Sequence, residues 1–81
     1  KERGGITNIS FLDNWVVFEF EKGDVIQVGY NQIDDIRLDP RMGPTVLRIV
    51  DRKRNRWFFE TVNHDVAACA VQKWREIYSL N

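Results

Sequence analysis

Few side chains in this chain of 81 residues can act as a nucleophile or a general base. The single histidine, His64, stands where a helix is expected to begin, so we predict a surface residue of the first helical turn. A catalytic triad or a metal cage would need further partners. Cys69 lies among alanines in the same expected helix, and nothing basic is placed to activate its thiol. We therefore expect Cys69 to be a small buried hydrophobe.

Two further patterns are reminiscent of catalytic motifs. Asp34 and Asp35 form a carboxylate pair, but adjacent strand residues point to opposite faces, so the two cannot act on one bond. Gly4 and Gly5 precede a strand rather than a helix, so they do not form a phosphate-binding loop. We therefore predict a protein that is not an enzyme and that has no cofactor and no metal site.

A basic cluster stands at the tip of an expected hairpin. It consists of Arg52, Lys53, Arg54 and Arg56. Such a cluster attracts the phosphates of an anionic lipid surface or of RNA; the alternative is an ordinary solvated hairpin tip. Asp51 reduces its charge, and no aromatic residue interleaves with it as a base-stacking platform. We expect contact with an anionic membrane as a second function, and no binding of nucleic acid.

Length and composition place the chain among small single domains. The chain has 12 basic residues (Lys and Arg) and 12 acidic residues (Asp and Glu), so its net charge gives no general attraction to nucleic acid or to an anionic membrane. One Cys excludes an internal disulfide and suits a reducing compartment, so we expect the cytoplasm, with membrane or cytoskeleton association. Because the chain begins at Lys1 rather than Met, we expect one domain, residues 1–81, cut from a longer protein.

The hydrophobic pattern predicts six strands followed by one helix. Period-two alternation and turn residues give strands over Ile6 to Leu12, Trp15 to Glu21, Val25 to Tyr30, Ile33 to Leu38, Thr45 to Val50 and Arg56 to Val62. The helix runs from Asp65 to Leu80, with an apolar stripe of Ala67, Ala70, Val71, Trp74, Ile77 and Tyr78. Glu60 and Asn63 mark its start. The strand that leads to Pro40 is expected at a sheet edge, where a peptide can add as a further strand. The alternative is an edge whose charged side chains prevent such pairing.

These elements predict a mainly β fold with one C-terminal helix, a β-sandwich or partly open barrel that the helix caps. The expected core comprises Ile9, Val16, Phe18, Phe20, Ile26, Val28, Ile33, Leu47, Ile49, Trp57, Phe59, Ala70, Trp74 and Ile77.

Motifs along nearly the whole chain carry a family resemblance: Gly5-Ile6-Thr7, Gly23-Asp24-Val25-Ile26-Gln27, Tyr30-Asn31-Gln32-Ile33, Thr45-Val46-Leu47-Arg48-Ile49 and Trp57-Phe58-Phe59-Glu60-Thr61. Together with the Trp74 helix, they resemble the third lobe (F3) of a FERM domain, a phosphotyrosine-binding-like member of the pleckstrin-homology superfold. A free-standing pleckstrin-homology-like domain is the alternative, since the other two lobes are absent. The family's first strand is short or missing here, so we expect an open edge that a second copy can complete as a homodimer.

The resemblance implies a peptide-binding groove between an edge strand and the helix. Its expected residues are Asp34, Asp35, Ile36, Arg37 and Leu38 on the strand, and Cys69, Lys73 and Glu76 on the helix. Relatives that bind phosphotyrosine use basic residues there, for which Arg37, Arg41 and Lys73 are candidates, but Asp34 and Asp35 favour a neutral or basic peptide. The first hairpin loop, Leu12 to Trp15, holds none of the cations with which pleckstrin-homology domains bind lipid headgroups. We predict a protein-interaction or scaffolding module, an adaptor, with membrane association as the alternative.

Overall fold

Six short strands, one 3-10 turn and one helix follow one another along residues 3–79, the part of the chain that the computed structural model describes. The elements are β1 (Ile6–Phe11), β2 (Trp15–Phe20), β3 (Val25–Gly29), η1 (Tyr30–Gln32), β4 (Ile33–Leu38), β5 (Val46–Asp51), β6 (Arg56–Glu60) and α1 (His64–Ser79). Several strands are one or two residues shorter than predicted, and the expected polar corner at Asn31 and Gln32 is the 3-10 turn. Leu80, the expected last helical residue, lies outside the described residues.

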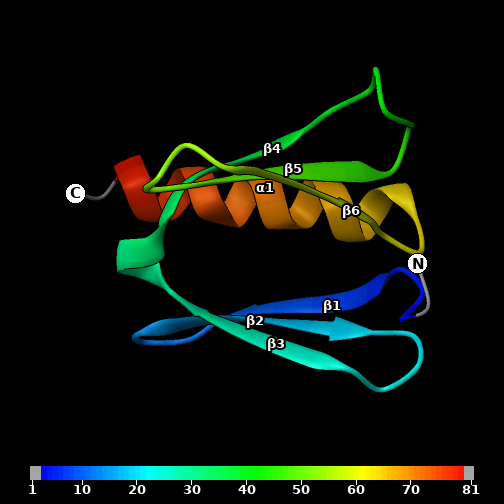
Figure 1. Cartoon of the computed structure of the whole chain (residues 1–81), viewed down its shortest axis with the longest axis horizontal. Helices are drawn as coiled ribbons and strands as arrows, with labels where there is room; N and C mark the ends of the chain where they lie inside the picture. The colour runs from blue at the N-terminus through cyan, green and yellow to red at the C-terminus, as the bar shows by residue number, and fades with distance from the viewer. Residues whose placement is uncertain (1–2, 80–81) are drawn as a thin grey trace.

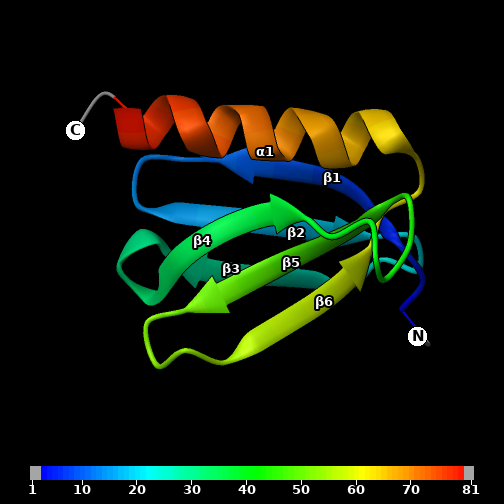
Figure 2. The same ribbon diagram turned by 90° about the horizontal axis from the view of Figure 1, so that it is seen from above.

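The strands form two antiparallel meanders that face each other. One sheet has the order β1-β2-β3 and the other has the order β4-β5-β6. In Figure 1 the two sheets lie one above the other with α1 behind them, and Figure 2 shows α1 running along the side where β1 and β4 lie. This arrangement confirms the predicted fold class, a mainly β sandwich capped by one C-terminal helix, and it is consistent with a pleckstrin-homology-like sandwich.

The corner between the sheets is held by side chains of η1. The side-chain oxygen of Gln32 accepts a hydrogen bond from the Gly29 N–H at 3.2 Å. The Tyr30 hydroxyl donates to the Leu12 carbonyl at 2.6 Å, which ties the corner to the first hairpin. Burial, and to a smaller extent the charge of Asp13, raises the pKa of Tyr30. The direction from β3 into β4 is therefore fixed by contacts on both sides of the turn.

The two strands beside the helix each contain a bulge. The register shifts between Ile6 and Asn8 in β1, and between Ile33 and Asp35 in β4. A bulge adds one residue to the strand, so residues three apart come to face the same side. Ile6 and Ile9 are both buried for this reason, and so are Ile33 and Ile36. Strict period-two alternation places only one residue of each pair in the core, so Ile6 and Ile36 are core residues that the sequence analysis did not predict.

The helix α1 buries one stripe of its surface against β1 and β4. The Asn63 side-chain oxygen accepts a hydrogen bond from the Val66 N–H at 3.0 Å, which caps the first turn. Trp74 is the largest fully buried side chain, and Ala67, Ala70 and Val71 are buried with it. His64 is exposed in the first turn, as predicted. Cys69 is exposed, and the expectation of a buried thiol is wrong because Cys69 points away from the stripe.

The core differs from its prediction mainly along β6 and β3. Trp57 is 51% exposed, and Ile26, Val28 and Phe59 are only partly buried. These residues line the open side of the sandwich, so they are covered only in part. Ile77 is likewise only partly buried. The core also contains residues that the prediction omitted: Ile6, Ile36, Val46, Ala67 and Val71. Within the described residues, α1 is too short and too polar to cross a bilayer.

Candidate functional site

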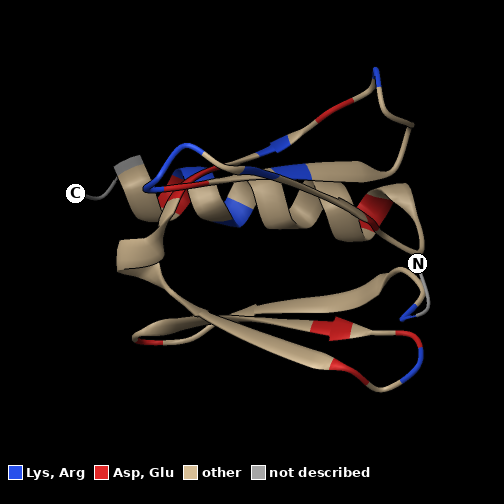
Figure 3. Cartoon of the chain, viewed as in Figure 1, with Lys and Arg blue, Asp and Glu red and all other residues tan. Residues whose placement is uncertain are grey.

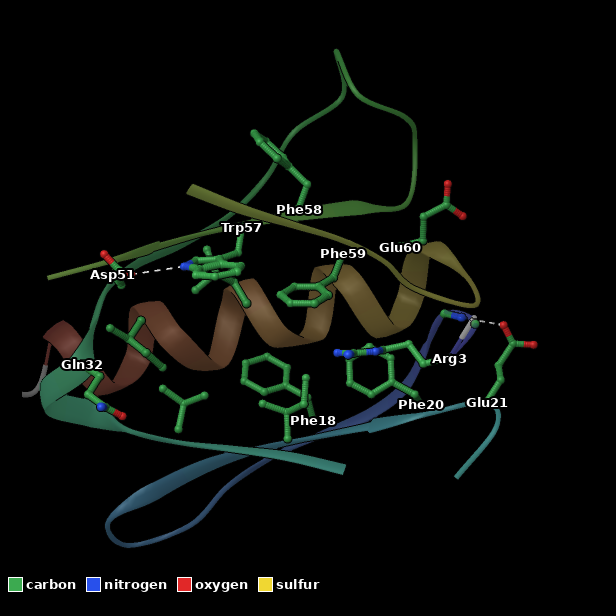
Figure 4. A pocket seen from close by; sticks show the side chains of 16 residues that line it. Arg3, Phe18, Phe20, Glu21, Gln32, Asp51, Trp57, Phe58, Phe59 and Glu60 are labelled. Atoms are coloured by element: carbon green, nitrogen blue, oxygen red, sulfur yellow. Dashed lines mark hydrogen bonds between the residues drawn. The ribbon is translucent and has the colours of Figure 1, made fainter. Parts of the chain in front are cut away.

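An apolar cleft opens between β3 and β6, on the side of the sandwich opposite α1. Its volume is about 1010 Å³. Figure 4 shows Phe18, Phe20, Trp57 and Phe59 lining the middle of the cleft, with α1 behind them. The ring centroids of Phe59 lie 6.4 Å from Phe18 and 5.8 Å from Phe20. The cleft therefore continues the hydrophobic core to the surface rather than forming a separate polar pocket.

Polar residues close one end of the cleft. The guanidinium of Arg3 lies 5.2 Å from the centroid of the Phe20 ring and 3.7 Å from the Asp24 carboxylate. The Glu21 carboxylate accepts a hydrogen bond from the Gly5 N–H at 2.7 Å. A Cβ at Gly4 would lie 2.9 Å from the Glu21 side chain, and Gly4 has a φ of 76°, so the segment before β1 needs glycine at this position. These contacts hold the N-terminal segment against the sandwich.

Asp51 organises the turn between β5 and β6 at the other end of the cleft. Its carboxylate accepts hydrogen bonds from the Lys53 and Asn55 N–H groups, both at 2.9 Å. It also accepts one from the Trp57 indole N–H at 3.2 Å, which fixes the half-exposed ring. Desolvation acts to raise the pKa of Asp51, but the hydrogen bonds from Trp57, Asn55 and Lys53 together hold it below its ordinary value. Asp51 thus has a structural task in the turn.

A second, smaller groove lies between β4 and α1. Its volume is about 440 Å³, and it is lined by Asp35, Ile36, Arg37, Trp74, Arg75 and Tyr78. Tyr78 forms part of its wall: its ring centroid lies 4.4 Å from that of Trp74, and its hydroxyl donates a long hydrogen bond of 3.4 Å to the Ile33 carbonyl. This groove is the place where the sequence analysis expected a peptide.

The register of β4 decides which of its backbone groups face the groove. The Asp39 N–H donates to the Val46 carbonyl at 3.0 Å, so Asp39 forms a hydrogen-bonded pair with β5. Hydrogen-bonded positions alternate along an antiparallel strand, so Arg37 also faces β5. Ile36 and Leu38 therefore present their N–H and C=O groups away from β5, toward the helix side. Among residues 3–79, backbone groups of β4 that do not pair with β5 thus lie on the side of the strand where Trp74 and Tyr78 form an aromatic wall.

The expected groove residues are only partly brought together. On the strand, Asp35, Ile36 and Arg37 line the groove, but Leu38 does not. The Asp34 carboxylate lies 3.7 Å from Arg54. Asp35 instead pairs with Arg37 at 2.7 Å, so the two aspartates have different partners. On the helix, Cys69, Lys73 and Glu76 are exposed but do not line the groove. The helix residues that line the groove are Trp74, Arg75 and Tyr78. The four-residue step from Trp74 to Tyr78 places Tyr78 on the same helix face, so the sequence contained a signal for Tyr78.

The basic cluster of Arg52, Lys53, Arg54 and Arg56 is partly used inside the fold. Arg52 Nε donates a long hydrogen bond of 3.5 Å to the Ile33 carbonyl, and Arg54 pairs with Asp34. Within residues 3–79, neither Lys53 nor Arg56 has a side-chain hydrogen bond or ion pair. Figure 3 shows basic residues gathered on the β5–β6 turn, residues of both charges on α1, and mainly acidic residues on the β1–β3 sheet. The cluster is a solvated tip in which two exposed cations, Arg52 and Arg54, contact β4.

Comparisons with protein families, with curated proteins and with solved structures found no match. In the described part of the chain, no three His, Cys, Asp or Glu side chains are arranged to hold a metal ion. The groove, the cleft and the basic tip are therefore the observations from which a function is inferred.

Proposed function

We propose that this protein is a non-catalytic interaction module that binds an extended peptide segment in the groove between β4 and α1. The proposal includes the resemblance to the third lobe of a FERM domain. One observation carries it: Ile36, whose backbone groups face away from β5, lines the groove together with Trp74 and Tyr78. A peptide that pairs with these groups gains main-chain hydrogen bonds from the strand and side-chain contacts from the helix.

Charge defines the peptide further. The groove lining contains one carboxylate, from Asp35, and two guanidinium groups, from Arg37 and Arg75, which gives a formal charge of +1. Asp35 and Arg37 pair with each other, so Arg75 is the charge left to meet a ligand. The sequence analysis expected a neutral or basic peptide because it counted the charge of Asp34 in the groove. The Asp34 carboxylate instead lies near Arg54. We infer a largely apolar peptide with one acidic residue beside Arg75, bound at micromolar strength, or about −8 kcal/mol.

The test uses a matched pair of charge reversals on the helix. Arg75→Glu places a carboxylate in the groove, whereas Lys73→Glu makes the same change on an exposed position outside the lining. From a panel of apolar peptides with acidic, neutral or basic residues, we expect acidic ones to bind the wild type best. Arg75→Glu should weaken their binding at least about 10-fold and Lys73→Glu by less than about 3-fold.

Amide chemical shifts of the wild-type chain locate the bound peptide. Binding in the groove should perturb residues 35–39 and the 71–78 segment of α1. A shift map that avoids both segments, or equal losses in Arg75→Glu and Lys73→Glu, would overturn the groove. In the first case the binding surface would have to be sought at the open cleft.

Weak membrane association is the second candidate. The exposed Lys53, free of internal partners within the described residues, favours it together with Arg56 at the start of β6. Arg52 and Arg54 contact β4 instead, so the cluster attracts an anionic surface without forming a headgroup pocket.

A further inference from the structure

The cleft between β3 and β6 has the lining and the order of a preformed site for a small ligand. Its volume of about 1010 Å³ is close to the upper limit for sites that hold drug-sized molecules. Its aromatic walls are held in place, because the Trp57 indole N–H donates to Asp51 and the Phe59 ring packs on Phe18 and Phe20. A ligand therefore meets rings that are already ordered, which lowers the entropic cost of binding.

The carboxylates that line the cleft are either used within the chain or directed away from the rings. Glu21 accepts a hydrogen bond from the Gly5 N–H at 2.7 Å, and Asp51 accepts hydrogen bonds from its own turn and from Trp57. Figure 4 shows the Glu60 carboxylate pointing away from the aromatic rings. None of these three carboxylates is thus placed to receive a cation inside the cleft.

Arg3 is the charged side chain that projects over the aromatic floor. Its guanidinium lies 5.2 Å from the centroid of the Phe20 ring, as Figure 4 shows. The Asp24 carboxylate is 3.7 Å from Arg3 Nε, too far for a hydrogen bond, and this exposed ion pair is weak. Among residues 3–79, no hydrogen bond uses the guanidinium N–H groups of Arg3. They therefore remain available in the fork geometry that binds a carboxylate through two parallel hydrogen bonds.

We propose that the cleft binds a small monocarboxylic acid with a long apolar body, of the size of a medium-chain fatty acid. Its carboxylate pairs with the Arg3 guanidinium, and its hydrocarbon chain lies between β3 and β6. The chain covers Ile26, Val28 and Trp57, which the fold leaves partly or half exposed. Removing this apolar surface from water provides the driving force, and the ion pair sets the direction of the bound molecule.

This site is independent of the proposed peptide groove. The two share no lining residue and lie on opposite sides of the sandwich. Binding of a peptide and binding of a fatty acid can therefore fail separately, and each has its own experiment.

Three probes with the same apolar chain and different head groups test the proposal by calorimetric titration near neutral pH. They are decanoate, decanol and decyltrimethylammonium. Formal charge alone favours the cation, because three carboxylates and one guanidinium line the cleft. The positions of these groups favour the anion instead. Decanoate should bind with a Kd between about 10 µM and about 1 mM, at least about 10-fold more tightly than decyltrimethylammonium and about 5-fold more tightly than decanol.

A matched pair of substitutions tests the contact with the carboxylate. Arg3→Gln removes the guanidinium, whereas Lys22→Gln removes the same charge from an exposed position in the adjacent turn, outside the cleft lining. Arg3→Gln should weaken decanoate binding at least about 10-fold and Lys22→Gln by less than about 3-fold. Decanol binding should stay within about 3-fold in Arg3→Gln, which shows that the apolar part of the cleft is intact.

Amide chemical shifts locate the bound chain. Decanoate should perturb β2, β3 and β6 and leave the 71–78 segment of α1 unchanged. The proposal is overturned if the wild type does not bind decanoate at about 1 mM, or if decyltrimethylammonium binds as tightly as decanoate. Equal losses in Arg3→Gln and Lys22→Gln, or shifts confined to β4 and α1, would also overturn it.

Discussion

Trp74 is the side chain on which the junction of helix and sheets depends, and its replacement by alanine is the most demanding test of the fold. The indole is 2% exposed and lies on the helix face that contacts β1 and β4. Its ring also supports Tyr78, whose centroid is 4.4 Å away, at the wall of the groove. Trp74→Ala should therefore affect stability and peptide binding together.

The expected cost follows from the area that the indole buries. A buried Trp removes about 150–250 Å² from water, which corresponds to about 4–6 kcal/mol. Measured losses for large-to-small changes of this kind are about 3–5 kcal/mol, because neighbouring side chains move partly into the space. A domain of this length has a total stability of about 4–12 kcal/mol. The variant should therefore lose about half of its stability, and its Tm should fall by at least about 12 °C.

Urea unfolding followed by circular dichroism measures this loss. Trp15→Ala is the matched control, because Trp15 is 43% exposed at the start of β2 and should cost only about 1 kcal/mol. If Trp74→Ala costs less than about 1.5 kcal/mol, or no more than Trp15→Ala, the indole does not hold the helix on the sheets and the packing argument fails.

Two further predictions concern the β5–β6 turn. Because the pKa of Asp51 is lowered from its ordinary value of 3.8, the stability that its carboxylate gives is present above that pH and is lost as the pH falls through the lowered pKa. The difference in unfolding free energy between wild type and Asp51→Ala should thus be constant near neutral pH and shrink below about pH 4; a difference that persists unchanged in acid would contradict it. For the basic tip, co-sedimentation with phosphatidylserine vesicles should fade as salt rises from about 0.01 M to about 0.15 M, where the Debye length falls from about 30 Å to about 8 Å. Lys53→Ala should weaken it about 5-fold, and salt-resistant binding to a single phosphoinositide isomer would show a specific pocket instead.

The groove and the cleft lie on opposite sides of the sandwich. The groove is lined by residues of β4 and α1, and the cleft is lined largely by residues of β2, β3 and β6. Figure 2 shows α1 and β6 on opposite sides of the molecule.

Local patterns in the sequence were sufficient to predict the elements and the fold class. Alternation at Val16, Phe18 and Phe20 marks a strand with one buried face, and these three residues are buried. The stripe from Ala67 to Trp74 marks the helix face that packs on the sheets. Gly23 in the β2–β3 turn has a φ of 93°, as its place in a tight turn requires. Such features depend on a few consecutive residues, so the sequence alone determines them.

Exposure of inward-facing residues, by contrast, depends on what lies across the sandwich. Trp57 alternates in phase with buried residues, yet it is half exposed because β6 ends its sheet beside the open cleft. Ile36 stands in a charged segment, yet a bulge turns it into the core. The register of a strand and its position at a sheet edge are set by pairing with distant strands, so the periodicity of hydrophobic residues in the sequence does not predict them.

In the candidate site too, some features follow from the sequence and others only from the tertiary structure. The sequence by itself determined that Asp35, Ile36 and Arg37 lie on a strand near a proline loop and that Trp74 faces inward from the helix. Only the tertiary structure decided that Arg75 and Tyr78 complete the groove, that Asp34 pairs with Arg54, and that a parallel bridge joins Ile6 to Thr61. The physical reason is that each of these facts joins residues far apart in the chain, whose contact depends on how the two sheets and the helix pack.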